Sequence, residues 1–154
     1  MTKAKDQRDS NGLLGALLKD SELLRTLIDT LPDHLYIKDV EGRYVLSNIA
    51  HVKSLGFASS EEVAGKTGFD FYPMELAKRY HADEREVIRS GRPLVAKEEP
   101  SVKENGNRRW YSTTKAPLRD SGGKIVGIVG IARDITERKR AEEKLRESEE
   151  RYRA

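Results

Sequence analysis

The feature of this sequence that most constrains its fold is an abrupt change in character near the C-terminal end. Residues 125–132 contain only isoleucine, valine, glycine and alanine, whereas residues 135–154 are dominated by charged side chains. A strand with one exposed face would alternate apolar and polar residues, so this continuous run predicts a strand buried on both faces. The sequence therefore predicts a central strand of a sheet that passes directly into a charged helix.

The charged helix has a defined start but little apolar surface. Asp134 is placed as its N-cap, and Glu137 follows three residues later, as in a capping box. Pairs of opposite charge at i,i+4 contribute only about 0.3–0.5 kcal/mol each, which does not hold a lone helix. We expect a parallel dimer to bury its thin apolar seam, which includes Leu145 and Tyr152.

The joint between strand and helix suggests a mechanical role. We expect Asp134, Thr136 and Glu137 to form the place where movement of the sheet becomes movement of the helix. The alternative is that Asp134 is simply a helix cap. A globular module that feeds an output helix is typical of a signalling domain, and a coupling free energy of about 1–3 kcal/mol suffices for such a switch.

A second flanking helix is predicted near the N-terminus. Apolar residues there recur in steps of three and four, which is typical of a short coiled coil. We expect a helix over residues 13–31, ended by Pro32, that packs on its own domain and also pairs with its copy in a second chain. Residues 1–12 are polar and are predicted to be a disordered tail. The predicted dimer contacts of this helix are Leu14, Leu17, Leu24 and Ile28.

Composition excludes several classes of function. The chain has no cysteine, so it has no disulfide, thiolate metal site or thiol nucleophile, and we expect it in the reducing cytoplasm. Its formal net charge is only +3 and the charges are interleaved, so no nucleic-acid partner is expected. The longest apolar run, residues 125–132, is far shorter than a membrane span, so no direct membrane insertion is expected.

Between the two flanking helices the sequence predicts short strands and helices. A turn at residues 39–42 joins the first two strands, and Gly42 can adopt positive φ there. Pro73 and Gly91 bound the longest helix, since proline suits a helix start and glycine a helix end. Pro100 marks its strand as an edge strand. The predicted strands cover 34–38, 43–47, 94–102, 107–118 and 125–132, and the predicted helices cover 49–55, 59–65 and 74–90.

Three local patterns carry further expectations. Ser59 and Glu62 have the spacing of a capping box at the start of a short helix. Trp110 and every second residue after it share one face of their strand. Gly127 and Gly130 lie inside a strand, which indicates close approach of a neighbouring segment.

The ordered set of elements resembles a PAS domain. The resemblance implies an α+β fold in which a five-stranded antiparallel sheet carries short helices on one face, forming a pocket, with residues 32–134 as the core. It implies the sensor module of a multidomain bacterial or archaeal signalling protein, such as a two-component histidine kinase. Residues 135–154 would be the signalling helix leading to a further domain, and residues 147–153 resemble the opening of another PAS repeat. The matching segments are 32–33, 38–43, Asn48, 55–57, 60–66, 90–93 and 130–138.

The resemblance also suggests what the pocket could hold. In the PAS domains of oxygen-sensing kinases a histidine of the long helix ligates haem iron, and His81 lies at a similar distance before the Gly91–Pro93 turn. The alternative is a half-exposed helix histidine beside acidic residues. Metal ligation by the three histidines together is not expected, since their spacing fits no zinc site. The candidate pocket residues are Tyr80, His81, Trp110 and Ile128.

Two functions from different classes therefore remain. The first is a dimerising relay module without a tightly bound cofactor, and the second is a sensor that binds haem through His81 or a small metabolite. A carboxylate ligand could contact Arg108, Arg109 and Lys115, although we expect these side chains to face solvent. An enzyme is not expected, because no catalytic triad order, phosphate-binding glycine loop or zinc-protease motif occurs.

Overall fold

The computed structural model describes residues 20–102, 106 and 108–153, which divide into two units between Leu31 and Pro32. In the first unit residues 20–30 are helical, and the Thr26 hydroxyl donates a hydrogen bond to the carbonyl oxygen of Glu22. Leu24 and Ile28 lie on this helix, as predicted. The predicted tail and the predicted contacts Leu14 and Leu17 lie outside the described residues.

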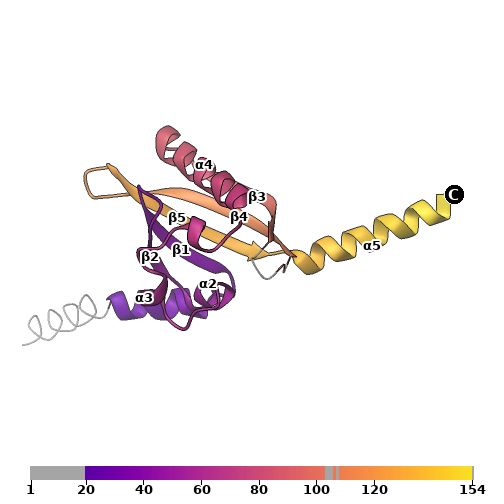
Figure 1. Cartoon of the computed structure of the whole chain (residues 1–154), viewed down its shortest axis with the longest axis horizontal. Coiled ribbons are helices and arrows are strands. Elements are labelled where there is room, and N and C mark those ends of the chain that lie inside the picture. Colours follow the sequence, from indigo (N-terminus) through magenta and orange to yellow (C-terminus); the bar gives the residue numbers. More distant parts are fainter. Residues whose placement is uncertain (1–19, 103–105, 107, 154) are drawn as a thin grey trace, which may run out of the picture. The chain divides into compact units, whose positions relative to one another are not determined.

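The second unit is built on a five-stranded antiparallel sheet, which confirms the predicted α+β class (Figure 1). The strand order is β2-β1-β5-β4-β3. The apolar strand β5 is central, as its two-sided apolar pattern predicts, and β3, which contains Pro100, is an edge strand. The strands are β1 (His34–Asp39), β2 (Tyr44–Ser47), β3 (Leu94–Val102), β4 (Arg108–Arg119) and β5 (Ile125–Asp134).

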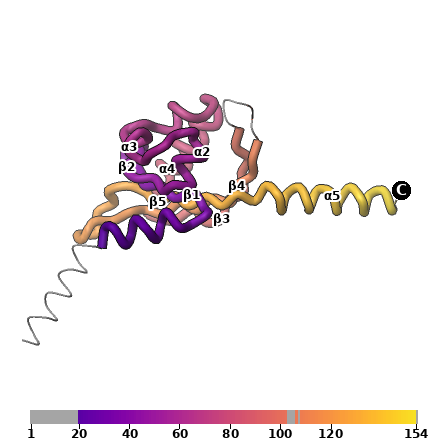
Figure 2. The backbone as a smooth tube through the Cα atoms, turned by 90° about the horizontal axis from the view of Figure 1, so that it is seen from below, coloured from indigo at the N-terminus to yellow at the C-terminus, as the bar shows by residue number. Residues whose placement is uncertain are grey.

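Short helices connect β2 to β3 and lie on one side of the sheet (Figure 2). The longest, α4 (Met74–Ser90), has the predicted bounds, and Gly91 ends it in the left-handed conformation with φ 67°. It contacts β3, β4 and β5, whereas the preceding short helices contact β1 and β2. The remaining helices are α2 (Ile49–Ser54), α3 (Ser60–Val63), the 3₁₀ turn η1 (Gly68–Asp70) and α5 (Thr136–Arg153).

The capping box predicted at Ser59 and Glu62 is wrong. Ser59 is the N-cap of α3, but its side chain makes no capping hydrogen bond. The hydroxyl of the next residue, Ser60, instead accepts a hydrogen bond from the backbone N–H of Ser47 at 3.0 Å, and this bond ties α3 to β2. A capping box does occur one element later, where Thr67 and Asp70 cap η1.

Two glycines of β5 allow neighbouring segments to approach closely, as predicted. A Cβ atom at Gly127 would overlap the backbone carbonyl of Lys38 on β1. A Cβ atom at Gly130 would overlap the ring of Tyr36, which is buried in the core with Tyr44, Val52 and Val63. The glycines of β5 therefore let β1 and its aromatic side chain lie against the central strand.

None of the helices within the described ranges is both long enough and apolar enough to cross a membrane.

Candidate functional site

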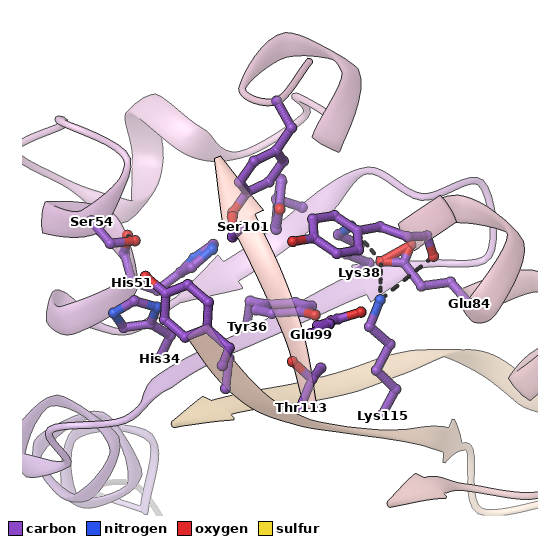
Figure 3. Close-up of a pocket in the computed structure, with 15 residues that line it drawn as sticks. His34, Tyr36, Lys38, His51, Ser54, Glu84, Glu99, Ser101, Thr113 and Lys115 are labelled. Atoms are coloured by element: carbon purple, nitrogen blue, oxygen red, sulfur yellow. Dashed lines mark hydrogen bonds and ion pairs between the residues drawn. The ribbon is translucent and has the colours of Figure 1, made fainter. Parts of the chain in front are cut away.

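A small cavity of about 40 Å³ lies between the sheet and its helices (Figure 3). Strands β1, β3 and β4 and helices α2 and α4 all contribute side chains to its wall. The wall is polar, unlike the interior of most small domains. Its tyrosines are Tyr36, Tyr44, Tyr72, Tyr80 and Tyr111, and its charged residues are Lys38, Glu84, Glu99 and Lys115.

Two lysines and one glutamate form a buried charge cluster in this wall. Lys38 of β1 and Lys115 of β4 approach Glu84 of α4 from two different strands (Figure 3). The Nζ atom of Lys38 pairs directly with Oε1 of Glu84, whereas Nζ of Lys115 lies 3.7 Å from the same oxygen. All three side chains are buried. Burial lowers the pKa of Lys38, although the charge of Glu84 and its hydrogen bond act in the opposite direction.

The tyrosines beside this cluster are held in their neutral form. Burial raises the pKa of Tyr36 and of Tyr44 well above the usual value, and Glu84 adds to both shifts. Burial likewise raises the pKa of Tyr80 to about 12, against a hydrogen bond with Ser101 that lowers it. Lys38 also lies over the ring of Tyr44, with Nζ 4.6 Å from the ring centre. The cavity therefore presents hydroxyl groups as well as charges.

Two histidines were not expected in this wall. His51 of α2 is buried, and its ring centre lies 5.0 Å from that of Tyr36. His34 lies beside Tyr111, with ring centres 5.3 Å apart. The alternation of β1 could have located His34, because it shares a strand face with Tyr36 and Lys38.

Of the four predicted pocket residues, the structure places only Tyr80 in the wall of the central cavity. Ile128 is buried in β5 next to Lys38 in the β1–β5 register, but it does not line the cavity. Trp110 is also outside the wall, because β4 turns the alternate residues Tyr111, Thr113 and Lys115 inward.

Lys115 corrects another expectation, since it is only 2% exposed and not solvent-facing. Arg108 is exposed, and Arg109 is half-buried and pairs with Asp134 at 3.5 Å.

His81 lines a neighbouring hollow of about 70 Å³ between α4 and the β1–β2 turn, which shares Lys38, Tyr80 and Glu84 with the central cavity. Its ring contacts Phe69, with ring centres 5.8 Å apart. A haem site requires an apolar pocket with an axial ligand that points into it. The central cavity instead has a polar wall, a volume of about 40 Å³ and no contribution from His81, so the described residues do not fit haem.

The joint between β5 and α5 is held to the neighbouring strand β4 by two hydrogen bonds to the backbone of Trp110. The N–H of Ile135 donates a hydrogen bond to the carbonyl oxygen of Trp110 at 2.8 Å, and the N–H of Trp110 donates to Oγ1 of Thr136 at 3.0 Å. Thr136 is buried. The first turn of α5 is therefore fixed to β4 as well as to β5.

Asp134 caps this joint. Its Oδ1 accepts a hydrogen bond from the N–H of Thr136 at 2.9 Å. Burial alone would raise the pKa of Asp134, but the hydrogen bonds from Thr136 and the charge of Arg109 outweigh burial and lower it. No hydrogen bond of Glu137 completes the predicted capping box within the described part of the chain.

Charged side chains connect the edge strand β3 to the same turn of α5. The carboxylate of Glu98 accepts hydrogen bonds from Arg138 and Lys139, each at 2.7 Å, and both interactions lower its pKa. The Nζ atom of Lys139 also lies 5.0 Å from the ring centre of Trp110. The start of α5 thus contacts β3, β4 and β5.

Residues 28–140 match the family described as PAS fold. The methanogenesis regulatory histidine kinase FilI of Methanothrix harundinacea is 34% identical over 125 residues, which are 81% of this chain and 14% of FilI. This chain therefore spans about one seventh of the length of that relative.

Solved structures give the same result. The PAS domain of Bordetella pertussis BvgS has a TM-score of 0.60 and 30% identity, over 86% of this chain and 97% of that one. Vibrio cholerae VqmA, solved as a dimer, has a TM-score of 0.66 and 28% identity over 73% of this chain and 50% of that one. Its complex with ligand and DNA has a TM-score of 0.65 at 28% identity, over 71% and 49% of the two chains.

Proposed function

This chain belongs to the PAS family, and from that premise we propose that it is a sensory module that passes a conformational signal through α5 to an output domain of the histidine-kinase type. The relatives named as histidine kinases and sensor proteins support a role in two-component signalling. The chain spans 14% of FilI and 11% of BvgS, which supports an output domain elsewhere in the same polypeptide. We assign the module itself no catalytic step, and we place it in the cytoplasm.

The observation that carries this proposal is the joint between the sheet and α5. The central strand β5 continues through Ile135 into α5. The backbone of Trp110 in β4 forms hydrogen bonds with Ile135 and Thr136 at the start of this helix. Beyond its first turns α5 is exposed, with Leu145 62% exposed and Tyr152 92% exposed. A shift of β4 relative to β5 would therefore change the direction or rotation of a helix that otherwise has few contacts in its own chain.

We further propose that the module works as a homodimer. An exposed helix with a thin apolar seam gains stability by pairing with a second copy. Leu24 in the N-terminal helix and Leu145 in α5 are both large apolar residues that are more than half exposed. VqmA, the similar protein described as a dimer, supports this assembly.

Replacing Asp134 by alanine distinguishes a role in transmitting the signal from a role in helix capping alone. If Asp134, Thr136 and Glu137 transmit the signal, Asp134→Ala leaves a folded dimer in which the stimulus no longer changes kinase autophosphorylation of the multidomain protein. The lost cap itself costs about 0.5–2 kcal/mol, measured by urea denaturation. Lys144→Ala, an exposed change on the same helix, serves as the control and retains the response. If the Asp134→Ala protein is less stable but its kinase still responds fully to the stimulus, Asp134 serves only as a helix cap.

A further inference from the structure

We infer that the central cavity binds a compact polar molecule of zero net charge that presents a hydrogen-bond acceptor to Lys115 and a hydrogen-bond donor to Glu99. The inference rests on the proposed sensory function, since it names the class of molecule that the module would sense. It is carried by the contacts of these two side chains, which face the cavity from neighbouring strands, β4 and β3 (Figure 3).

Lys115 is a buried cation whose hydrogen-bonding capacity is poorly used. An ammonium group has three donors, and a buried charge is costly unless it is paired and hydrogen-bonded. The polar contacts described for Nζ of Lys115 are long, at 3.5 Å to the carbonyl oxygen of Tyr80 and 3.7 Å to Glu84, and Nζ also lies 5.1 Å from the ring centre of Tyr80. Glu84 is already engaged at the same oxygen by Lys38. An acceptor atom in the cavity would complete the coordination of Lys115.

Glu99 provides carboxylate oxygens that can accept a hydrogen bond from a ligand. It is only 9% exposed, and its ion pair with Lys97 is long, at 3.9 Å. The same ammonium of Lys97 lies 2.7 Å from Asp83, which is its closer partner. A donor in the cavity would therefore satisfy the carboxylate of Glu99.

The charges of the cavity wall explain why the hydrogen-bond donor and the hydrogen-bond acceptor should belong to one molecule without net charge. In the wall, Lys38, Lys115 and Glu84 leave one positive charge in excess, and the negative charge of Glu99 balances it. A simple anion would be attracted by Lys115 but repelled by Glu99, and a simple cation would experience the reverse. A molecule with an acceptor and a donor at different positions meets both requirements.

The size of the cavity restricts the ligand further. An apolar cavity of about 150 Å³ holds benzene, and this cavity has about 40 Å³. The ligand is therefore smaller than a six-membered aromatic ring, or the part of it that enters the cavity is. Hydroxyl groups of Tyr36 and Tyr44 offer further partners to a polar ligand and would remain unsatisfied beside an apolar one.

Three probes of similar size test the inference on the unaltered chain. Acetamide has a donor and an acceptor, acetate at pH 7 has acceptors only, and methylammonium has donors only. NMR titration of the amide resonances is expected to give a millimolar dissociation constant for acetamide, at least tenfold lower than those for the other two probes. Equal affinity for the three probes, or no shift of cavity resonances with acetamide, would overturn the inference.

Variants then locate the bound probe. Lys115→Met and Glu99→Gln are each expected to weaken acetamide binding at least tenfold, whereas Lys124→Met, an exposed lysine outside the cavity, leaves it unchanged. Near-UV circular dichroism checks that each variant is folded. Unchanged affinity in both folded cavity variants would contradict the assignment. This binding experiment and the signalling experiment can fail independently, since Asp134→Ala can abolish signalling whether or not acetamide binds to the cavity.

Discussion

Replacing Glu84 by alanine is expected to lower the free energy of unfolding by about 3–5 kcal/mol, because it leaves two buried lysine charges without their shared carboxylate. Urea denaturation measures this loss directly. Glu86→Ala is the matched control, since Glu86 lies on the same helix but is exposed and pairs with Arg89 at the surface. The control is expected to retain nearly all of the wild-type stability.

A triple variant tests whether the lost stability comes from the unpaired lysine charges. Lys38→Met, Glu84→Leu and Lys115→Met together remove the whole charge cluster and leave apolar side chains of similar size. Such replacements are commonly neutral or stabilising, so the triple variant should regain most of the stability lost in Glu84→Ala. If Glu84→Ala is as stable as the wild type, or if the triple variant is less stable than Glu84→Ala, the pairing of these three charges does not govern the stability of the fold.

Raising the pH from 10 to 12 is expected to destabilise the fold by several kcal/mol. The buried tyrosines have raised pKa values, so between pH 10 and their folded pKa they keep a proton that the unfolded chain releases. Their stabilising contribution is therefore complete below pH 10 and is lost as the pH rises. The shift of Tyr80 to about 12 alone corresponds to about 2 kcal/mol over this range. Lys38, whose pKa is lowered, acts in the opposite direction but is a single group.

Two tyrosine substitutions isolate this effect. Tyr44→Phe removes a buried hydroxyl with a raised pKa and should reduce the pH slope of stability above pH 10 by about 1.4 kcal/mol per pH unit. Tyr152→Phe removes a tyrosine that is 92% exposed and should leave the slope unchanged. Urea denaturation at pH 8, 10 and 11 measures both slopes. Equal slopes in the two variants would contradict the placement of Tyr44 in a protected interior.

Patterns of local sequence predicted the elements well because each depends on few neighbours. The length of α4 follows from Pro73 and Gly91, and the central place of β5 follows from its two-sided apolar pattern. The edge position of β3 follows from Pro100. These patterns reflect the backbone geometry of proline and glycine and the burial of a whole strand. Both can be recognised in a single sequence.

The wall of the cavity could not be predicted in the same way. The usual rule turns apolar residues inward, but β1 and β4 turn Lys38 and Lys115 inward instead, toward a glutamate on α4. The charge that makes this possible, Glu84, is distant in sequence from both lysines, so no local pattern reveals the cluster. The hydrogen bond between Ser60 and Ser47 could not be predicted either, since Ser47 lies in another element.

Trp110 offers the most direct test of whether the cavity is coupled to α5. It is the sole tryptophan of the chain and contacts Thr136 and Lys139 at the start of the helix. Lys115→Met alters the cavity on the same strand without touching this joint. If the cavity and α5 are coupled, this variant shifts the emission maximum of Trp110 and its acrylamide quenching relative to Lys124→Met. Unchanged Trp110 emission and quenching, in a variant whose near-UV circular dichroism shows altered cavity tyrosines, would contradict the coupling.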